Sequence, residues 1–193
     1  ADLCAARGIL LVSDEIYDEF TYPDFLEDGR CPSPARFRDD MLLVRGFGKT
    51  YGCTGWRLGY AAGPAPLMAE MAKLQQYTFV CAPSMAQAGA AAALDVDMSA
   101  QVDAYRAKRD MVLDAFDGVA EVPRPGGAFY AFVEVPERLG LTATEFVERA
   151  IENNVLVIPG NVFSARDTHF RLSYAASDDK LRTGLEVLTG LMR

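Results

Sequence analysis

The sequence is poor in basic residues and nearly lacks histidine. Lysine and arginine number 19 against 27 aspartates and glutamates, which gives a formal net charge of −8. Nucleic-acid-binding proteins gather basic side chains against the phosphate backbone, so this balance argues against a nucleic-acid partner. The single histidine, His169, and the four widely spaced cysteines lack the pattern of a metal site or of a disulfide framework. We therefore expect no bound metal and reduced thiols, and we assign His169 no functional role.

Long apolar runs are also missing. No segment approaches the roughly 20 apolar residues that a membrane-spanning helix needs. The first residues lack the charged-then-apolar pattern of a secretion signal. Half of the 193 residues are hydrophobic and 24% are charged, which is an ordinary globular composition, long enough for one domain and part of another. We therefore expect an acidic cytoplasmic protein with no membrane contact.

Hydrophobic patterning in the first half predicts an α/β arrangement. Short apolar runs typical of buried strands occur at residues 8–12, 41–45 and 58–62. Polar residues follow the first two runs, at the position where open α/β sheets bind ligands. Helices are expected over residues 67–77 and from Ser84 onward.

The longest helical pattern begins at Ser99 and ends before Gly118. The pattern then changes to short strands and helices, with strands expected at residues 119–122, 128–135, 155–158 and 168–173 and helices at residues 142–153 and 178–192. Antiparallel strands mixed with helices are typical of an α+β domain. We therefore place a domain boundary near Asp117, with residues 1–117 in one domain and residues 118–193 in a second, smaller one.

Lys49 is the residue that best indicates a function. It lies in Gly-Phe-Gly-Lys-Thr-Tyr-Gly-Cys-Thr-Gly-Trp-Arg-Leu-Gly-Tyr, residues 46–60, where small residues surround it and Arg57 follows. Glycines let a bulky planar ligand approach the backbone, and a lysine amine in such a place attacks carbonyl carbons. The motif predicts a Schiff-base lysine and disfavours a merely solvated surface lysine. Trp56 and Tyr60 are expected to be core aromatics that flank the site.

Together with two further segments, this motif resembles the class I/II aminotransferases, which are pyridoxal-phosphate (PLP) enzymes of fold type I. The further segments are Ser-Asp-Glu-Ile-Tyr at residues 13–17 and Phe-Arg-Leu-Ser-Tyr-Ala at residues 170–175. The resemblance implies that residues 1–117 are the C-terminal part of the PLP-binding large domain, a mostly parallel sheet with helices that ends in a long linker helix. Residues 118–193 would be the small C-terminal domain.

The resemblance also implies roles for individual residues. Asp14 would keep the pyridine nitrogen of PLP protonated, and Tyr17 would hydrogen-bond the phenolic oxygen of the cofactor. Lys49 would bind PLP covalently and act as general base and acid, while Arg57 would bind the phosphate. Arg171 would bind the substrate α-carboxylate with two hydrogen bonds. From the residues alone, Asp14 could instead cap a helix, and Arg171 could belong to an ordinary salt bridge.

The sequence departs from the family pattern at several positions. The family usually has serine at one or both of the positions held by Gly46 and Gly48, and glycine is common at the position of Ser164. A full-length member is about twice as long as this domain-sized chain. We therefore expect a fragment that lacks the part before Ala1, where the family has a small-residue phosphate loop, a stacking aromatic and the asparagine of an Asn-Pro-x-Gly segment.

The function implied by the resemblance is PLP-dependent transfer of an amino group between an L-amino acid and a 2-oxo acid, by a homodimer when full length. One alternative is a PLP-dependent carbon–sulfur β-lyase of the same fold, which would share Asp14, Lys49 and Arg57. Another is a non-catalytic module, either a truncated remnant or the sensor part of a transcription regulator. The acidic charge and the absence of a helix-turn-helix segment disfavour the regulator.

Overall fold

The chain forms two compact units, Ala1–Ala100 and Gln101–Arg193, and the computed structural model describes every residue of both. The expected boundary near Asp117 lies later than this division. The long helix α4 (Ser99–Phe116) is grouped with the second unit because it contributes buried side chains to the core of that unit. None of the helices combines the length and the apolar composition that crossing a membrane requires.

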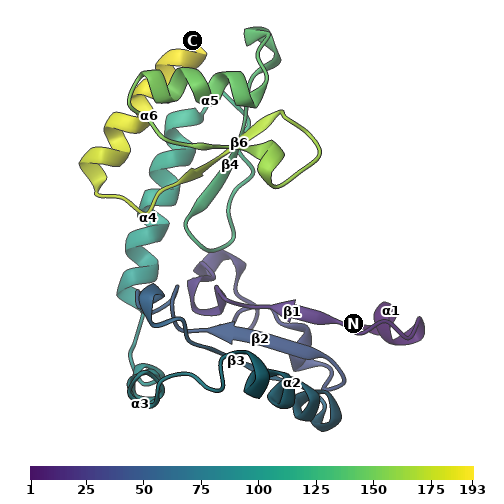
Figure 1. The fold of residues 1–193 in the computed structure, drawn as a ribbon. Helices are drawn as coiled ribbons and strands as arrows, with labels where there is room; N and C mark the ends of the chain where they lie inside the picture. The colour runs from purple at the N-terminus through teal and green to yellow at the C-terminus, as the bar shows by residue number, and fades with distance from the viewer. The chain divides into compact units, whose positions relative to one another are not determined.

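The first unit is built on a small mixed sheet with the strand order β1-β2-β3 (Figure 1). β1 (Val12–Asp14) and β2 (Leu42–Gly46) run parallel, as expected, whereas β3 (Gly59–Ala62) runs antiparallel to β2. The sheet is therefore less parallel than expected. Residues 47–58 between β2 and β3 form only a turn and the short 3-10 helix η4 (Thr54–Trp56), and a parallel connection needs a longer crossover.

Most other elements of the first unit lie close to their expected positions. Its remaining helical elements are α1 (Asp2–Ala6), η1 (Asp18–Phe20), η2 (Pro23–Phe25), η3 (Pro34–Arg36), α2 (Ala65–Thr78) and α3 (Ser84–Ala93). The two expected helices are thus confirmed as α2 and α3. The strand expected over residues 8–12 is wrong apart from its last residue, since the pairing with β2 starts only at Val12.

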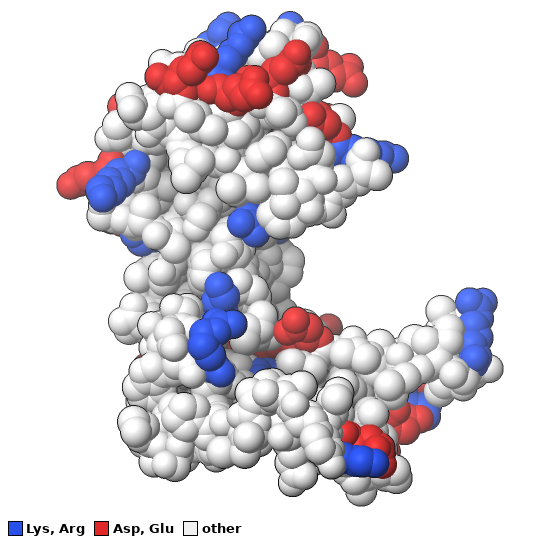
Figure 2. Space-filling model, viewed as in Figure 1, with Lys and Arg blue, Asp and Glu red and all other residues white.

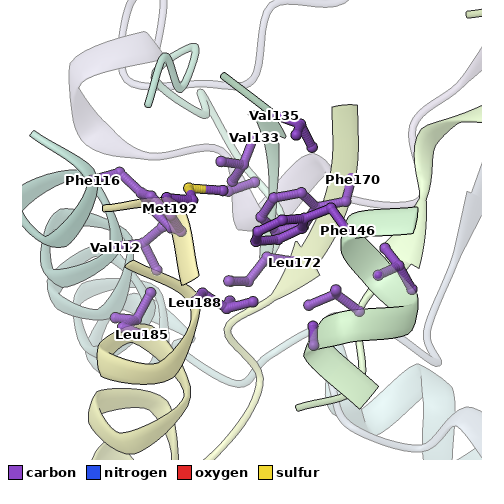
Figure 3. Close-up of a cluster of buried hydrophobic side chains, with 14 of the residues drawn as sticks. Val112, Phe116, Val133, Val135, Phe146, Phe170, Leu172, Leu185, Leu188 and Met192 are labelled. Atoms are coloured by element: carbon purple, nitrogen blue, oxygen red, sulfur yellow. The ribbon is translucent and has the colours of Figure 1, made fainter. Parts of the chain in front are cut away.

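The second unit packs three helices against an antiparallel sheet of order β4-β6-β5, formed by β4 (Tyr130–Glu134), β6 (His169–Ser173) and β5 (Ile158–Pro159). The helices are α4, α5 (Ala143–Glu152) and α6 (Asp178–Met192), with two short turns, η5 (Glu137–Leu139) and η6 (Gly160–Val162), in the connections. Figure 3 shows the shared core, in which the rings of Phe146 and Phe170 stack with centroids 5.2 Å apart.

Local sequence signals explain the helix ends in this unit. α5 begins at a capping box in which Thr142 Oγ1 accepts the backbone N–H of Glu145 and the Glu145 carboxylate accepts the backbone N–H of Thr142. The helices expected at residues 142–153 and 178–192 are confirmed. The strand expected at residues 119–122 is wrong, because the backbone N–H groups of Val119 and Ala120 donate to the carbonyl of Phe116 at the end of α4 and the chain forms a turn there.

Alternation along β4 and β6 gives the second sheet two different faces. One face is buried in the core and carries Ala131, Val133, Phe170 and Leu172. The other face carries Tyr130, Phe132, His169 and Arg171, all of them partly exposed. Two large polar or charged side chains therefore lie among aromatic rings on the face that the helices do not cover.

Candidate active site

The candidate cofactor residues of the first unit gather at one edge of its sheet. Asp14 ends β1 and Gly46 ends β2, and these parallel strands have their carboxyl ends on the same side. Gly46 is paired with Gly59 at the start of the antiparallel strand β3, so β3 begins at this edge as well. Lys49 lies three residues after the end of β2, and Arg57 lies two residues before the start of β3. The fold thus brings Asp14, Lys49 and Arg57 to the edge where α/β sheets bind ligands.

Lys49 lies in a tight turn that follows β2 in the chain. The backbone N–H of Tyr51 donates to the carbonyl of Phe47 at 3.0 Å and closes the turn around the lysine. The buried ring of Phe47 lies 6.0 Å from the ring of Tyr51 and 5.7 Å from the ring of Tyr60. Lys49 itself is half-buried. It is therefore not a fully solvated surface lysine.

Arg57 adopts a backbone conformation that is unusual for a residue with a side chain. Its φ of 54° and ψ of 44° lie in the left-handed region, which turns the chain from η4 into β3. The exposed guanidinium donates only to the backbone carbonyl of Thr54, at 3.2 Å, and forms no ion pair within the chain. Arg57 thus combines a left-handed backbone with a charge that no carboxylate of the chain pairs.

The expectation that Trp56 and Tyr60 are core aromatics is wrong. Trp56 is 47% exposed and Tyr60 is 43% exposed. The indole of Trp56 packs on Gly89 of α3, where a Cβ atom would come within 2.8 Å of the ring. Both rings are therefore only partly covered in this chain.

Asp14 and Tyr17 follow the end of β1 in an irregular segment. The exposed carboxylate of Asp14 accepts the backbone N–H of Ile16 at 3.2 Å and thereby shapes the turn. Asp14 caps no helix, because the next helical turn, η1, has Tyr17 as its N-cap and no side-chain cap. Tyr17 is half-buried. The structure thus leaves the Asp14 carboxylate without an ion pair at the sheet edge.

A buried ion-pair network beside Asp14 was not anticipated from the sequence. The carboxylate of Glu15, which is 8% exposed, accepts two hydrogen bonds from Arg45 at 2.8 and 3.2 Å. It also accepts the hydroxyls of Ser33 at 2.5 Å and Ser13 at 3.0 Å. Arg45 in turn pairs with Asp18 at 3.2 Å. The network connects the ends of β1 and β2 to the loop before β2. The one feature of the sequence that could have indicated it is Arg45, a single charged residue in the otherwise apolar strand β2.

This network makes the stability of the first unit dependent on pH. Burial acts to raise the pKa of Glu15, but hydrogen bonds from Ser33, Arg45 and Ser13 outweigh it and hold the pKa below its ordinary value of 4.5. A carboxyl whose pKa is lowered by folding stabilises the protein above the unfolded-state pKa. That contribution is lost as the pH falls through the folded-state pKa.

We expect Glu15→Gln to lower the free energy of unfolding by about 2 kcal/mol at neutral pH, since it removes a charged acceptor from a half-buried arginine. The measurement is urea unfolding followed by the fluorescence of Trp56, the single tryptophan, which lies in the first unit. The variant should also lose stability less steeply than wild type below pH 4.5. Glu19→Gln, at an exposed position nearby, is the matched control, and equal losses in both variants would contradict the role of the network.

Gly46 packs closely against the end of the Ile16 side chain. A Cβ atom on Gly46 would overlap the Cδ1 atom of Ile16, and one on Gly48 would lie 3.2 Å from the Cα atom of Thr54. A serine at position 46 would therefore require Ile16 to move. The apolar Ile16 side chain occupies the space that a hydroxyl-bearing side chain would need.

Arg171 belongs to the second unit. It occupies the middle of the central strand β6, opposite Phe132 on β4 and Ile158 on β5. The side chain is half-buried, and no carboxylate of the chain forms an ion pair with it. The alternative of an ordinary salt-bridged strand arginine is therefore not supported within this chain.

Comparisons with known proteins agree with the motifs. The family model for aminotransferases of class I and II matches residues 1–188. The probable aspartate aminotransferase of Methanocaldococcus jannaschii is 34% identical over 97% of this chain and 51% of its own length. The aspartate aminotransferase of Pyrococcus abyssi is 32% identical, over 100% of this chain and 51% of its own length.

The solved structures give the same result. The aromatic aminotransferase from Pyrococcus horikoshii matches with a TM-score of 0.89 and 30% identity, over 98% of this chain and 52% of its own. The chain spans about half the length of the curated relatives that it matches. The match of the family model over nearly the whole sequence establishes that this chain belongs to the class I and II aminotransferases, whose cofactor is PLP.

Proposed function

We propose that the protein that carries this chain is a PLP-dependent aminotransferase, which exchanges amino groups between an L-amino acid and a 2-oxo acid. The observation that carries the proposal is the grouping at the sheet edge of the first unit. Asp14 and Arg57 are exposed at this edge, carry opposite charges and form no ion pair in the chain. Lys49, which lies between them in the sequence, is half-buried on the turn after β2. Unpaired charges at a ligand-binding edge are typical of a site that binds a charged ligand.

The side chains at this edge match the chemical groups of PLP. Lys49 offers an amine for the aldehyde, Asp14 a carboxylate for the pyridine nitrogen, Tyr17 a hydroxyl for the phenolic oxygen and Arg57 a guanidinium for the phosphate. The hydroxyl of Thr50, next to Lys49, is buried and has no hydrogen-bond partner in the chain. A buried hydroxyl without a partner is rare unless a ligand or another chain segment supplies one.

The mechanism assigns a separate task to each side chain. PLP, when bound, supplies an electron sink for the negative charge that develops at the substrate Cα atom. Lys49 Nζ binds the cofactor, removes the proton from Cα as a general base and returns a proton as a general acid. The Asp14 carboxylate holds a proton on the pyridine nitrogen, and the two-pronged guanidinium of Arg57 binds phosphate oxygens.

Arg171 completes the proposal on the substrate side. L-amino acids and 2-oxo acids share a carboxylate at the carbon next to the reacting centre. One arginine can therefore serve both halves of an amino-group exchange by binding this carboxylate with two parallel hydrogen bonds. The unpaired, half-buried guanidinium supports this role, because a cation in such a place is stabilised when it gains an anionic partner.

We also propose that the protein acts as a homodimer in the cytoplasm. Large apolar side chains are exposed at the end of α2 and at the start of α3, with Tyr77 at 81%, Phe79 at 69% and Met85 at 81%. Exposed apolar groups on this scale mark surfaces that another chain or chain segment covers. On the face shown in Figure 2, basic side chains are scattered and form no broad positive surface.

The test is an assay of the full-length protein with PLP, glutamate and a series of 2-oxo acids. We expect formation of 2-oxoglutarate together with the matching amino acid. We expect residues 1–193 alone to be inactive, because they span about half the length of the relatives. Pyruvate and a thiol formed from cysteine conjugates, without amino transfer, would instead assign the carbon–sulfur β-lyase activity.

A further inference from the structure

We propose that Tyr130 and Phe163 form an aromatic clamp that positions Arg171 for the substrate carboxylate. The proposal rests on the proposed function, in which Arg171 binds that carboxylate. The clamp would determine the orientation of the guanidinium and leave its N–H donors available to one planar anion. Tyr130 and Phe163 are thus positioning residues, which act on the substrate through Arg171.

Both rings contact the Arg171 guanidinium. The central guanidinium carbon of Arg171 lies 4.5 Å from the centroid of the Tyr130 ring and 4.4 Å from the centroid of the Phe163 ring. The two rings make no ring contact with each other, so they approach the guanidinium from different sides. Aromatic faces attract a cation within about 6 Å of the ring centroid. Arg171 is therefore held by two rings while no carboxylate of the chain occupies its donors.

The sheet fixes the position of Tyr130. In the antiparallel pairing of β4 with β6, Tyr130 is opposite Ser173, which makes it the diagonal neighbour of Arg171 on the same face. The same relation holds one step along the sheet, where Phe132 stacks on His169 with centroids 5.0 Å apart. Strand register thus places Tyr130 and Arg171 as neighbours on one face of the sheet.

A glycine fixes the position of Phe163. Phe163 follows η6, and its backbone N–H donates to the carbonyl of Gly160 at 2.8 Å. A Cβ atom on Gly160 would collide with the carbonyl oxygen of His169 and lie 2.9 Å from Cζ of Phe132. Glycine therefore lets this turn lie directly on β6, and the turn brings Phe163 over Arg171. The Phe163 side chain is 51% exposed, so it is not required by the core.

This arrangement has a consequence for the substrate. A ring face attracts the guanidinium but offers no strong hydrogen-bond acceptor, so the N–H groups at the edge of the guanidinium remain available. A carboxylate can pair with two of these N–H groups in the guanidinium plane. The clamp thus favours ligands with a carboxylate and contributes nothing to amines that lack one. A lysine at position 171 would keep the charge but lose the planar group that the rings hold.

The experiment measures carboxylate binding and catalysis in the full-length holoenzyme. Tyr130→Leu and Phe163→Leu each remove a ring, whereas Tyr130→Phe and Phe163→Tyr are matched variants that keep one. Calorimetric titration with 3-phenylpropionate, an unreactive carboxylate, should give a dissociation constant about tenfold higher for each leucine variant, the equivalent of about 1.4 kcal/mol. The two ring-preserving variants should bind as wild type does.

Kinetics separate positioning from a general structural effect. The leucine variants should raise KM for amino acids about tenfold, the same factor as in binding. Their kcat, and their rate with an amine that lacks a carboxylate, should stay at the wild-type level. The absorption of bound PLP should also be unchanged.

The outcomes distinguish the two proposals. Wild-type carboxylate affinity in both leucine variants, combined with a large loss in Arg171→Lys, would overturn the clamp and leave Arg171 as the carboxylate site. Wild-type affinity in Arg171→Lys as well would overturn the carboxylate role of Arg171 itself. Because the titration needs no turnover, it decides the clamp even if the protein proves to be a lyase.

Discussion

Replacing Lys49 with alanine should abolish covalent binding of PLP by the full-length protein. The near-visible absorption of the bound cofactor should disappear, and transamination should fall to background, because the variant lacks the amine that is proposed to bind the aldehyde. Borohydride reduction of the wild-type protein followed by peptide mapping should place the pyridoxyl group on Lys49. The half-buried position of this lysine on a turn at the ligand-binding edge is the structural basis of the prediction.

Lys73→Ala is the matched control for Lys49→Ala. Lys73 lies on α2 with a side chain 67% exposed, and its only ion pair is with Glu70 on the same helix, at 3.7 Å. This variant should keep the absorption spectrum and the activity of wild type. A pyridoxyl group mapped to Lys73 or to Lys108 would show that the central assignment is wrong.

Asp14→Ala should slow the proton-transfer step by several powers of ten, each power corresponding to about 1.4 kcal/mol of activation free energy. The reason is electrostatic. Without the carboxylate, the pyridine nitrogen loses the group that holds its proton, and the charge that develops at the substrate Cα atom is no longer stabilised. The measurement is a single-turnover experiment with the loaded enzyme and an excess of amino acid.

The fold around Asp14 should tolerate this change. The carboxylate is exposed, and its contact within the chain is one hydrogen bond from the backbone N–H of Ile16. Asp39→Ala, at another exposed position in the same unit, is the control and should react as wild type does. An unchanged single-turnover rate in Asp14→Ala with retained cofactor would refute the role of Asp14.

The residues of the candidate site could be proposed from the sequence because each lies in a short motif. Asp14 and Tyr17, Lys49 and Arg57, and Arg171 occur in three segments whose order resembles one family. The long helices were equally accessible, since apolar periodicity and caps are local signals. The expected helix over residues 178–192 matches α6, and the capping box at Thr142 marks the start of α5.

Other features could not be predicted because they depend on neighbours that are distant in the sequence. Trp56 and Tyr60 look like core residues, but their exposure depends on what packs against them, and in this chain they are 47% and 43% exposed. The direction of β3 and the missing strand at residues 119–122 depend on which strands find partners. Strand pairing is a tertiary property, so an alternating pattern alone does not establish it.

The sequence by itself therefore determined the family, the helices and the identity of the residues proposed to hold the cofactor and the substrate, because local motifs and periodicity carry that information. Only the tertiary structure decided how these residues are supported. Glu15 meets Arg45 and Ser33 through the pairing of β1 with β2 and the path of the loop before β2. Arg171 lies between its two rings because strand register places one of them and a glycine turn places the other. Such contacts join segments far apart in the chain, and their geometry exists only after the strands have paired.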